Sequence, residues 1–127
     1  MLTTTTAPLF PLTANIAKFS YLSVGASANS VVQFPTGVSF VFQTDGNFVA
    51  YKDGSPVAAT ASNSSGSNLF LVFQTDGNLV VYSGSTPLWA TETGGVATGA
   101  YLVLQDKSPY IQIVGQDGSV YYTANEK

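Results

Sequence analysis

The sequence contains no cysteine and no histidine. Without cysteine, the chain can form neither a disulfide framework nor a thiolate metal site. Without histidine, it lacks the commonest general base, the usual partner of a serine nucleophile and the commonest transition-metal ligand. We therefore expect a protein that is not an enzyme, with no catalytic residues, no metal and no cofactor.

Charged residues are also scarce, at 9% of the chain, whereas an average globular protein has roughly 25%. The formal net charge is −3, and arginine is absent. The four basic residues are scattered lysines: Lys18, Lys52, Lys107 and Lys127. A nucleic acid or an anionic membrane surface requires a concentrated basic patch, so neither is an expected partner.

Long apolar runs are missing as well, since no segment approaches the roughly 20 residues that span a bilayer. The first residues lack a positive region, and Pro8 and Pro11 interrupt their apolar run, which does not suit a secretory signal. We expect a soluble protein that is cytoplasmic or secreted by a non-classical route. The 127 residues, 45% of them hydrophobic, are enough for the core of one domain.

A repeat organises the chain. The segment VFQTDGNFVAY at residues 41–51 recurs as VFQTDGNLVVY at residues 72–82, with an offset of 31 residues. A third, eroded copy follows around Gln105, and its tail places Tyr121 where the second copy has Trp89. We expect an N-terminal extension of unassigned role at residues 1–18 and one domain at residues 19–127. Its repeats would cover about 33–63, 64–95 and 96–127.

Each repeat predicts short β-strands. Residues 39–43 and 48–51 are rich in β-branched and aromatic side chains, and Asp45-Gly46-Asn47 between them is a strong hairpin signal. One repeat can hold about four such strands, whose sheet cannot bury its apolar face alone. An all-β prism of three four-stranded sheets around a common axis is therefore the expected fold. A sandwich or barrel with the same number of strands is the alternative.

Alternation along the strands separates a polar set from the core-forming residues. The candidate binding residues of the first repeat are Gln43, Asp45, Asn47, Val49 and Tyr51. Those of the second repeat are Gln74, Asp76, Asn78, Val80 and Tyr82. Carboxylates accept hydrogen bonds from hydroxyl groups strongly, and amides can both donate and accept. With a small apolar side chain and a phenol beside them, these types suit a neutral sugar.

The pattern Gln-x-Asp-x-Asn-x-Val-x-Tyr, present twice at a constant period, resembles the signature of the monocot bulb-type, snowdrop-like mannose-binding lectins. The resemblance covers roughly residue 19 to the C-terminus. It implies a β-prism II fold with pseudo-threefold symmetry and one shallow, metal-independent mannose site on each sheet. It also implies that Gln, Asp and Asn bind hydroxyls 2 and 3 of mannose, that Tyr binds hydroxyl 4, and that Val packs against the ring.

The third copy departs from this signature. It keeps Gln105 but has Lys107, Pro109, Ile111 and Ile113 where Asp, Asn, Val and Tyr are expected. We expect this third site to be degenerate. The resemblance further implies a homodimer formed by exchange of the C-terminal strand, here residues 119–124. The family's central tryptophan positions would be occupied by Ala58, Trp89 and Tyr121, with Trp89 in the core.

Two other interpretations are open. The Asp-Gly-Asn segments can be turns alone, in which case the chain is a prism that serves as a structural or protein-interaction module without sugar binding. A glycosidase would need two carboxylates within roughly 5–9.5 Å of each other. Asp45 and Asp76 occupy equivalent points of different sheets and should be far apart. Asp53, the nearest other carboxylate in its repeat, has Gly84 as its counterpart.

Overall fold

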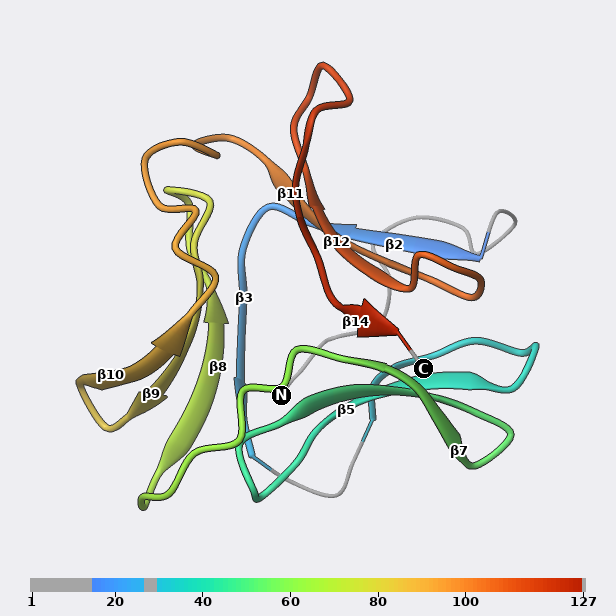
Figure 1. Cartoon of the computed structure of the whole chain (residues 1–127), viewed down its shortest axis with the longest axis horizontal. Helices are drawn as coiled ribbons and strands as arrows, with labels where there is room; N and C mark the ends of the chain where they lie inside the picture. The colour runs from blue at the N-terminus through green and yellow to red at the C-terminus, as the bar shows by residue number, and fades with distance from the viewer. Residues whose placement is uncertain (1–14, 27–29, 127) are drawn as a thin grey trace.

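The computed structural model describes residues 15–26 and 30–126. Within these ranges the chain forms strands, turns and loops, with no helix. The strands make three separate antiparallel sheets, and Figure 1 shows the sheets arranged around a common centre. The expected all-β prism is confirmed, in preference to a sandwich or a barrel.

We number the sheets by the repeat that each contains. The first sheet holds β4 (Ser30–Gln33), β5 (Val38–Phe42), β6 (Phe48–Lys52), β7 (Ser55–Ala59) and β14 (Asn125–Glu126). The second holds β3 (Leu22–Gly25), β8 (Leu69–Phe73), β9 (Leu79–Ser83) and β10 (Thr86–Ala90). The third holds β2 (Ile16–Phe19), β11 (Tyr101–Gln105), β12 (Ile111–Val114) and β13 (Val120–Thr123). The short β14 adds a fifth strand to the first sheet.

The repeats contribute fewer strands than expected. Each supplies three consecutive strands to its own sheet, and the fourth strand of each sheet comes from the segment before β5. In that segment β2 joins the third sheet, β3 the second and β4 the first. The N-terminal segment therefore connects all three sheets. The expectation of four strands per repeat was wrong because the chain after β7 and β10 bends over the hairpin loops instead of extending.

The domain boundary expected between residues 18 and 19 falls inside β2. Ala17 and Lys18 pair with Leu104 and Val103 of β11, so they belong to the prism. Most of the expected extension, residues 1–14, lies outside the described residues.

Period-two alternation places the core inside the prism. In the first sheet Phe40 pairs with Ala50 and Phe42 with Phe48, and all four side chains are buried. The second sheet repeats the arrangement with Leu71 opposite Val81 and Phe73 opposite Leu79. Full burial of one such large side chain contributes roughly 1.5–3 kcal/mol. The opposite face of each hairpin is therefore left for the candidate binding residues.

Each sheet has an equivalent position on the third strand of its repeat, and the side chains of two of these positions meet in the core. Ala58 pairs with Ala50, Trp89 with Val81, and Tyr122 with Ile113. The ring centroids of Trp89 and Tyr122 are 6.4 Å apart in an edge-to-face arrangement. Trp89 packs against the core, as expected.

Tyr122, and not Tyr121, is thus the counterpart of Trp89. The third repeat has two more residues than the second before this position, one in the loop between β11 and β12 and one in the loop before β13. The expectation allowed for only one of them and was therefore wrong by one residue. Tyr121 lies at the resulting bulge and is 37% exposed. The small Ala58 is accommodated because the first sheet has Phe40 and Phe48 where the second has Leu71 and Leu79.

Candidate functional site

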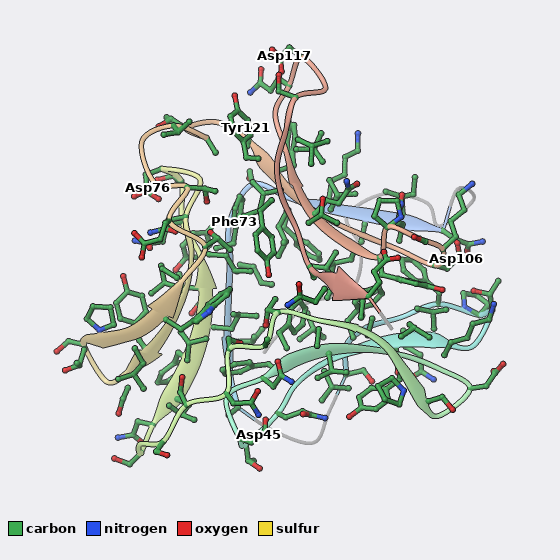
Figure 2. All side chains as sticks on the ribbon, viewed as in Figure 1. Asp45, Phe73, Asp76, Asp106, Asp117 and Tyr121 are labelled. Carbon is green, nitrogen blue, oxygen red and sulfur yellow. The ribbon has the colours of Figure 1, made fainter. Side chains whose placement is uncertain are left out.

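The structure brings the two predicted residue sets together on two separate sheets. We call Gln43, Asp45, Asn47, Val49 and Tyr51 site one, and Gln74, Asp76, Asn78, Val80 and Tyr82 site two. In each, the first three residues lie in a hairpin loop and the last two lie on the following strand. Figure 2 shows Asp45 and Asp76 on different sheets, pointing outward from the molecule.

The two hairpin loops close in the same way. In site one the backbone N–H of Gln43 donates to the carbonyl of Asn47, and that of Gly46 donates to the carbonyl of Gln43, both at 2.9 Å. Gln74, Gly77 and Asn78 make the same pair of bonds at the same distances. The repeated sequence thus produces a repeated backbone geometry.

Each aspartate uses one carboxylate oxygen to stabilise the hairpin turn. The backbone N–H of Asn47 donates to Oδ1 of Asp45 at 2.9 Å, and that of Asn78 donates to Oδ1 of Asp76 at 3.0 Å. Such an Asx turn leaves Oδ2 as an additional acceptor. Both aspartates are exposed, so this oxygen can accept from a ligand hydroxyl.

Each asparagine is oriented through its carbonyl oxygen. Oδ1 of Asn47 accepts from the backbone N–H of Ser62 at 3.3 Å, and Oδ1 of Asn78 accepts from that of Thr93 at 3.3 Å. In site two the hydroxyl of Thr91 also donates to Oδ1 of Asn78, at 3.1 Å. Because the oxygen is engaged by the protein, the amide N–H groups remain as the donors for a ligand.

Ser62 and Thr93 are supporting residues that the sequence interpretation missed. Both are buried, and their hydroxyls donate to the carbonyls of Gly46 and Gly77 at 2.8 and 2.6 Å. They fasten the chain that follows the third strand onto the hairpin loop. A signal was present, because both residues carry a hydroxyl and are separated by the repeat offset of 31 residues.

Gln and Tyr are coupled at the other end of each site. In site one Nε2 of Gln43 donates to the hydroxyl of Tyr51, and in site two the hydroxyl of Tyr82 donates to Oε1 of Gln74 at 3.4 Å. Both pairs are partly buried. The contact holds an amide and a phenol side by side, and each retains further hydrogen-bonding capacity.

The valines form the floor between these polar ends. Val49 is 4% exposed and Val80 is 2% exposed, so each offers little area. Each site therefore combines a carboxylate oxygen, amide donors and a phenol over a small apolar surface. That arrangement suits a compact neutral ligand with several adjacent hydroxyls.

The third hairpin differs from the other two. The backbone N–H of Gln105 donates to the carbonyl of Tyr110, so this loop is one residue longer than its equivalents. The side chain of Gln105 donates to the carbonyl of Pro109 at 2.6 Å. The one signature residue that this copy keeps is therefore used within its own loop.

The longer loop also changes which residues correspond to the signature. Val103 pairs with Gln112 and Tyr101 with Val114, in the places where Val72 pairs with Val80 and Phe70 with Tyr82. Gln112 and Val114 thus take the Val and Tyr positions, and the assignment of Ile111 and Ile113 was wrong. Those two isoleucines are fully buried in the core.

In the described residues no group of three or more His, Cys, Asp or Glu side chains could hold a metal ion. In the same part of the chain no helix is long and apolar enough to cross a membrane.

The resolved pKa shifts lie outside the two sites. Hydrogen bonds from Ser119 lower the pKa of Asp117, and burial raises the pKa of Tyr122 to about 12.

No protein-family model and no curated protein matches the chain. Solved structures do match. The snowdrop (Galanthus nivalis) mannose-specific agglutinin, complexed with methyl α-D-mannoside, is 32% identical over 83% of this chain and 93% of its own, with a TM-score of 0.59. A monomeric mannose-binding lectin from Gastrodia elata is 28% identical over 87% and 96%, with a TM-score of 0.65. The Polygonatum cyrtonema lectin complexed with monomannoside is 29% identical over 80% and 89%, with a TM-score of 0.59. These relatives are lectins, which are non-enzymatic carbohydrate-binding proteins.

Proposed function

Because the chain belongs to the family of monocot bulb-type mannose-binding lectins, we propose that it binds mannose-containing glycans through sites one and two. The observation that carries this proposal is the duplication of one side-chain arrangement on two sheets. In both sites an exposed Asp carboxylate uses Oδ1 in the turn and can accept a further hydrogen bond at Oδ2, the Asn amide is oriented by a backbone N–H, and Gln contacts Tyr.

The chemistry of the sites fits a pyranose without a metal. Adjacent hydroxyls can donate to Oδ2 of the aspartate and accept from the asparagine amide, while Val lies beneath the C–H surface of the ring. A hydrogen bond to the charged aspartate contributes about 1.5–3 kcal/mol. In this proposal the third hairpin binds no sugar, because Gln105 is engaged by Pro109 and no carboxylate occupies the position of Asp45.

One shallow site should bind a monosaccharide weakly, since a millimolar Kd corresponds to about −4.1 kcal/mol. Two sites on one chain can raise the affinity for a surface that displays many mannose residues. We therefore propose clustered mannose glycans or glycoproteins as the partners. Asp45 and Asp76 face outward from different sheets (Figure 2), as such multivalent contact requires.

The test is calorimetric titration with methyl α-mannoside, the ligand of the snowdrop complex. Wild type should bind with a stoichiometry near two, Asp45→Asn and Asp76→Asn near one each, and the double variant not at all. Asparagine is the sharpest substitution because its carbonyl oxygen can still accept the Asx-turn hydrogen bond. The charged acceptor is lost while the loop is preserved.

Asp117→Asn is the matched control. Oδ1 of Asp117 accepts the backbone N–H of Ser119 at 2.9 Å in the same kind of turn, but Asp117 belongs to neither site. This variant should retain both binding events. If wild type binds neither methyl α-mannoside nor any mannose glycan on an array, the prism is better described as a scaffold with a protein partner.

A further inference from the structure

The two sites differ in one residue at their edge. Asn63 and Gly94 are separated by the repeat offset and follow the same path past their sites. The backbone N–H of the next residue makes the same bond in both cases. Ser64 donates to the carbonyl of Asp45 at 2.8 Å, and Gly95 donates to that of Asp76 at 2.9 Å. The residue at this edge is therefore asparagine in site one and glycine in site two.

In site one, Asn63 covers the aspartate. Its Nδ2 donates to Oδ2 of Asp45 at 3.3 Å, while Oδ1 of the same carboxylate accepts from Asn47. Both carboxylate oxygens thus have a protein partner, and the Asn63 side chain stands beside the carboxylate on the exposed surface. A ligand that enters site one must share Oδ2 with this amide.

In site two no side chain extends from this position, because it is occupied by Gly94. A Cβ atom added to Gly94 would lie 3.1 Å from Oδ2 of Asp76 and 3.3 Å from Cβ of Asn78. Gly94 is not among the glycines with positive φ, so the backbone conformation does not require glycine here. Glycine instead lets the backbone pass close to the aspartate and the asparagine of the site, and no side chain atoms extend from Gly94 past the Asp76 carboxylate.

We propose that this edge position determines which glycans each site accepts, an inference that rests on the proposed mannose binding. Because no side chain extends from Gly94, site two can hold a mannose that carries a further sugar next to the hydroxyl bound by Asp76. The Asn63 side chain closes that edge in site one, which takes mannose unsubstituted on that side. One chain would thus recognise two different parts of a mannose glycan.

The test isolates each site. The Asp45→Asn protein retains site two, and the Asp76→Asn protein retains site one. Each is titrated by calorimetry with methyl α-mannoside and with four methyl mannobiosides, in which hydroxyl 2, 3, 4 or 6 carries the second mannose. At least one mannobioside should bind site two within ~3-fold of methyl α-mannoside but bind site one at least ~10-fold more weakly, where tenfold corresponds to 1.4 kcal/mol.

Exchange of the edge residues then assigns the cause. Asn63→Gly in the Asp76→Asn background should remove the penalty for that mannobioside in site one. Gly94→Asn in the Asp45→Asn background should introduce it in site two. Because Gly94→Asn also crowds Asp76, it could abolish all binding, and in that case Asn63→Gly decides.

Failure of the proposed mannose binding and failure of this inference give different results. If neither isolated site binds methyl α-mannoside, the proposed function itself fails. If both bind it, but all four mannobiosides bind the two sites alike or Asn63→Gly leaves the penalty in place, the edge position does not set specificity and only this inference is overturned.

Discussion

Gly77 lies in the second hairpin loop with a φ of 89°, in the left-handed region that side chains rarely adopt. A Cβ atom there would also lie 2.1 Å from the carbonyl oxygen of Ala97. Gly118, in the loop between β12 and β13, has the same φ of 89°, but a Cβ there would meet nothing within 4 Å. A comparison of the two positions therefore distinguishes the cost of backbone strain at positive φ from the cost of close packing.

We predict that Gly77→Ala destabilises the protein more than Gly118→Ala does. Both variants should lose about 1–2 kcal/mol through the left-handed backbone, and Gly77→Ala should lose roughly 1–3 kcal/mol more through overpacking against Ala97. Urea unfolding of both variants and wild type measures the difference. Equal losses of unfolding free energy in the two variants would contradict the prediction and show that the loop that carries Ala97 moves aside at no energetic cost.

Asp45 and Asp76 show that turn chemistry and binding chemistry are compatible in one residue. Oδ1 of each aspartate stabilises the hairpin turn, and Oδ2 takes no part in that turn. Asp117 makes the same turn in a loop without the other signature residues. The turn alone is therefore no evidence of a site, and the surrounding Gln, Asn, Val and Tyr carry the distinction.

At the scale of elements, the third repeat differs from the others through two extra residues. One lies in the loop between β11 and β12, and the other lies between β12 and β13. The first displaces the signature positions to Gln112 and Val114, and the second brings Tyr122 opposite Ile113. This sheet keeps its place in the prism while its loop departs from the signature, because β11 and β12 still bury Leu102, Leu104, Ile111 and Ile113 in the core.

Tyr122 on β13 packs edge-to-face with Trp89 on β10, and burial raises its pKa from 10.0 to about 12. The folded state thus disfavours the tyrosinate. Below pH 10 the hydroxyl is protonated in both states and this contribution to stability is complete. As the pH rises from about 10 to about 12 the unfolded state ionises first, so stability is lost in that window.

We predict that Tyr122→Phe reduces this alkaline loss of stability. The effect is measured as the urea midpoint of unfolding at several pH values from about 9 to about 12, a range that covers the shift of the pKa. Tyr121→Phe is the control because Tyr121 lies on the same strand but is exposed. Wild type and Tyr122→Phe with parallel pH profiles would contradict the argument.

At the scale of the whole molecule, the C-terminal strands are the candidate contact between copies. In this chain β13 pairs with its own β12, and β14 pairs with its own β7. Both lie at sheet edges, and Val120 is 55% exposed. Exchange of such a segment between two copies would reproduce the same hydrogen bonds at low cost.

The homodimer through residues 119–124 is therefore still a prediction. Light scattering across a range of protein concentrations should give a mass that rises from that of one chain, 13.3 kDa, toward twice that value. The Gastrodia lectin is described as monomeric. A constant mass of one chain at every concentration would remove the dimer and leave two sites per particle.

Much of this protein followed from the sequence alone. The 31-residue period and the strand pattern of each repeat predicted an all-β prism, and the twice-repeated Gln-x-Asp-x-Asn-x-Val-x-Tyr pattern resembled that of the bulb-type lectins. They also predicted that each residue set would gather on one hairpin. Local physics explains this success, because the alternation of side chains and the Asp-Gly-Asn turn are specified within about ten residues of chain.

Only the tertiary structure decided which segments complete each sheet and which residues correspond in the third repeat. Strands β2 and β3 pair with segments far along the chain, as Ile16 does with Gln105 and Leu22 with Phe73, and no local pattern records such pairing. An inserted residue shifts every later side chain by one, so Tyr122 rather than Tyr121 faces Trp89. The contrast between Asn63 and Gly94 likewise became meaningful only when the chain beyond each third strand was seen to return to the site, because a contact across 18 residues depends on the whole fold.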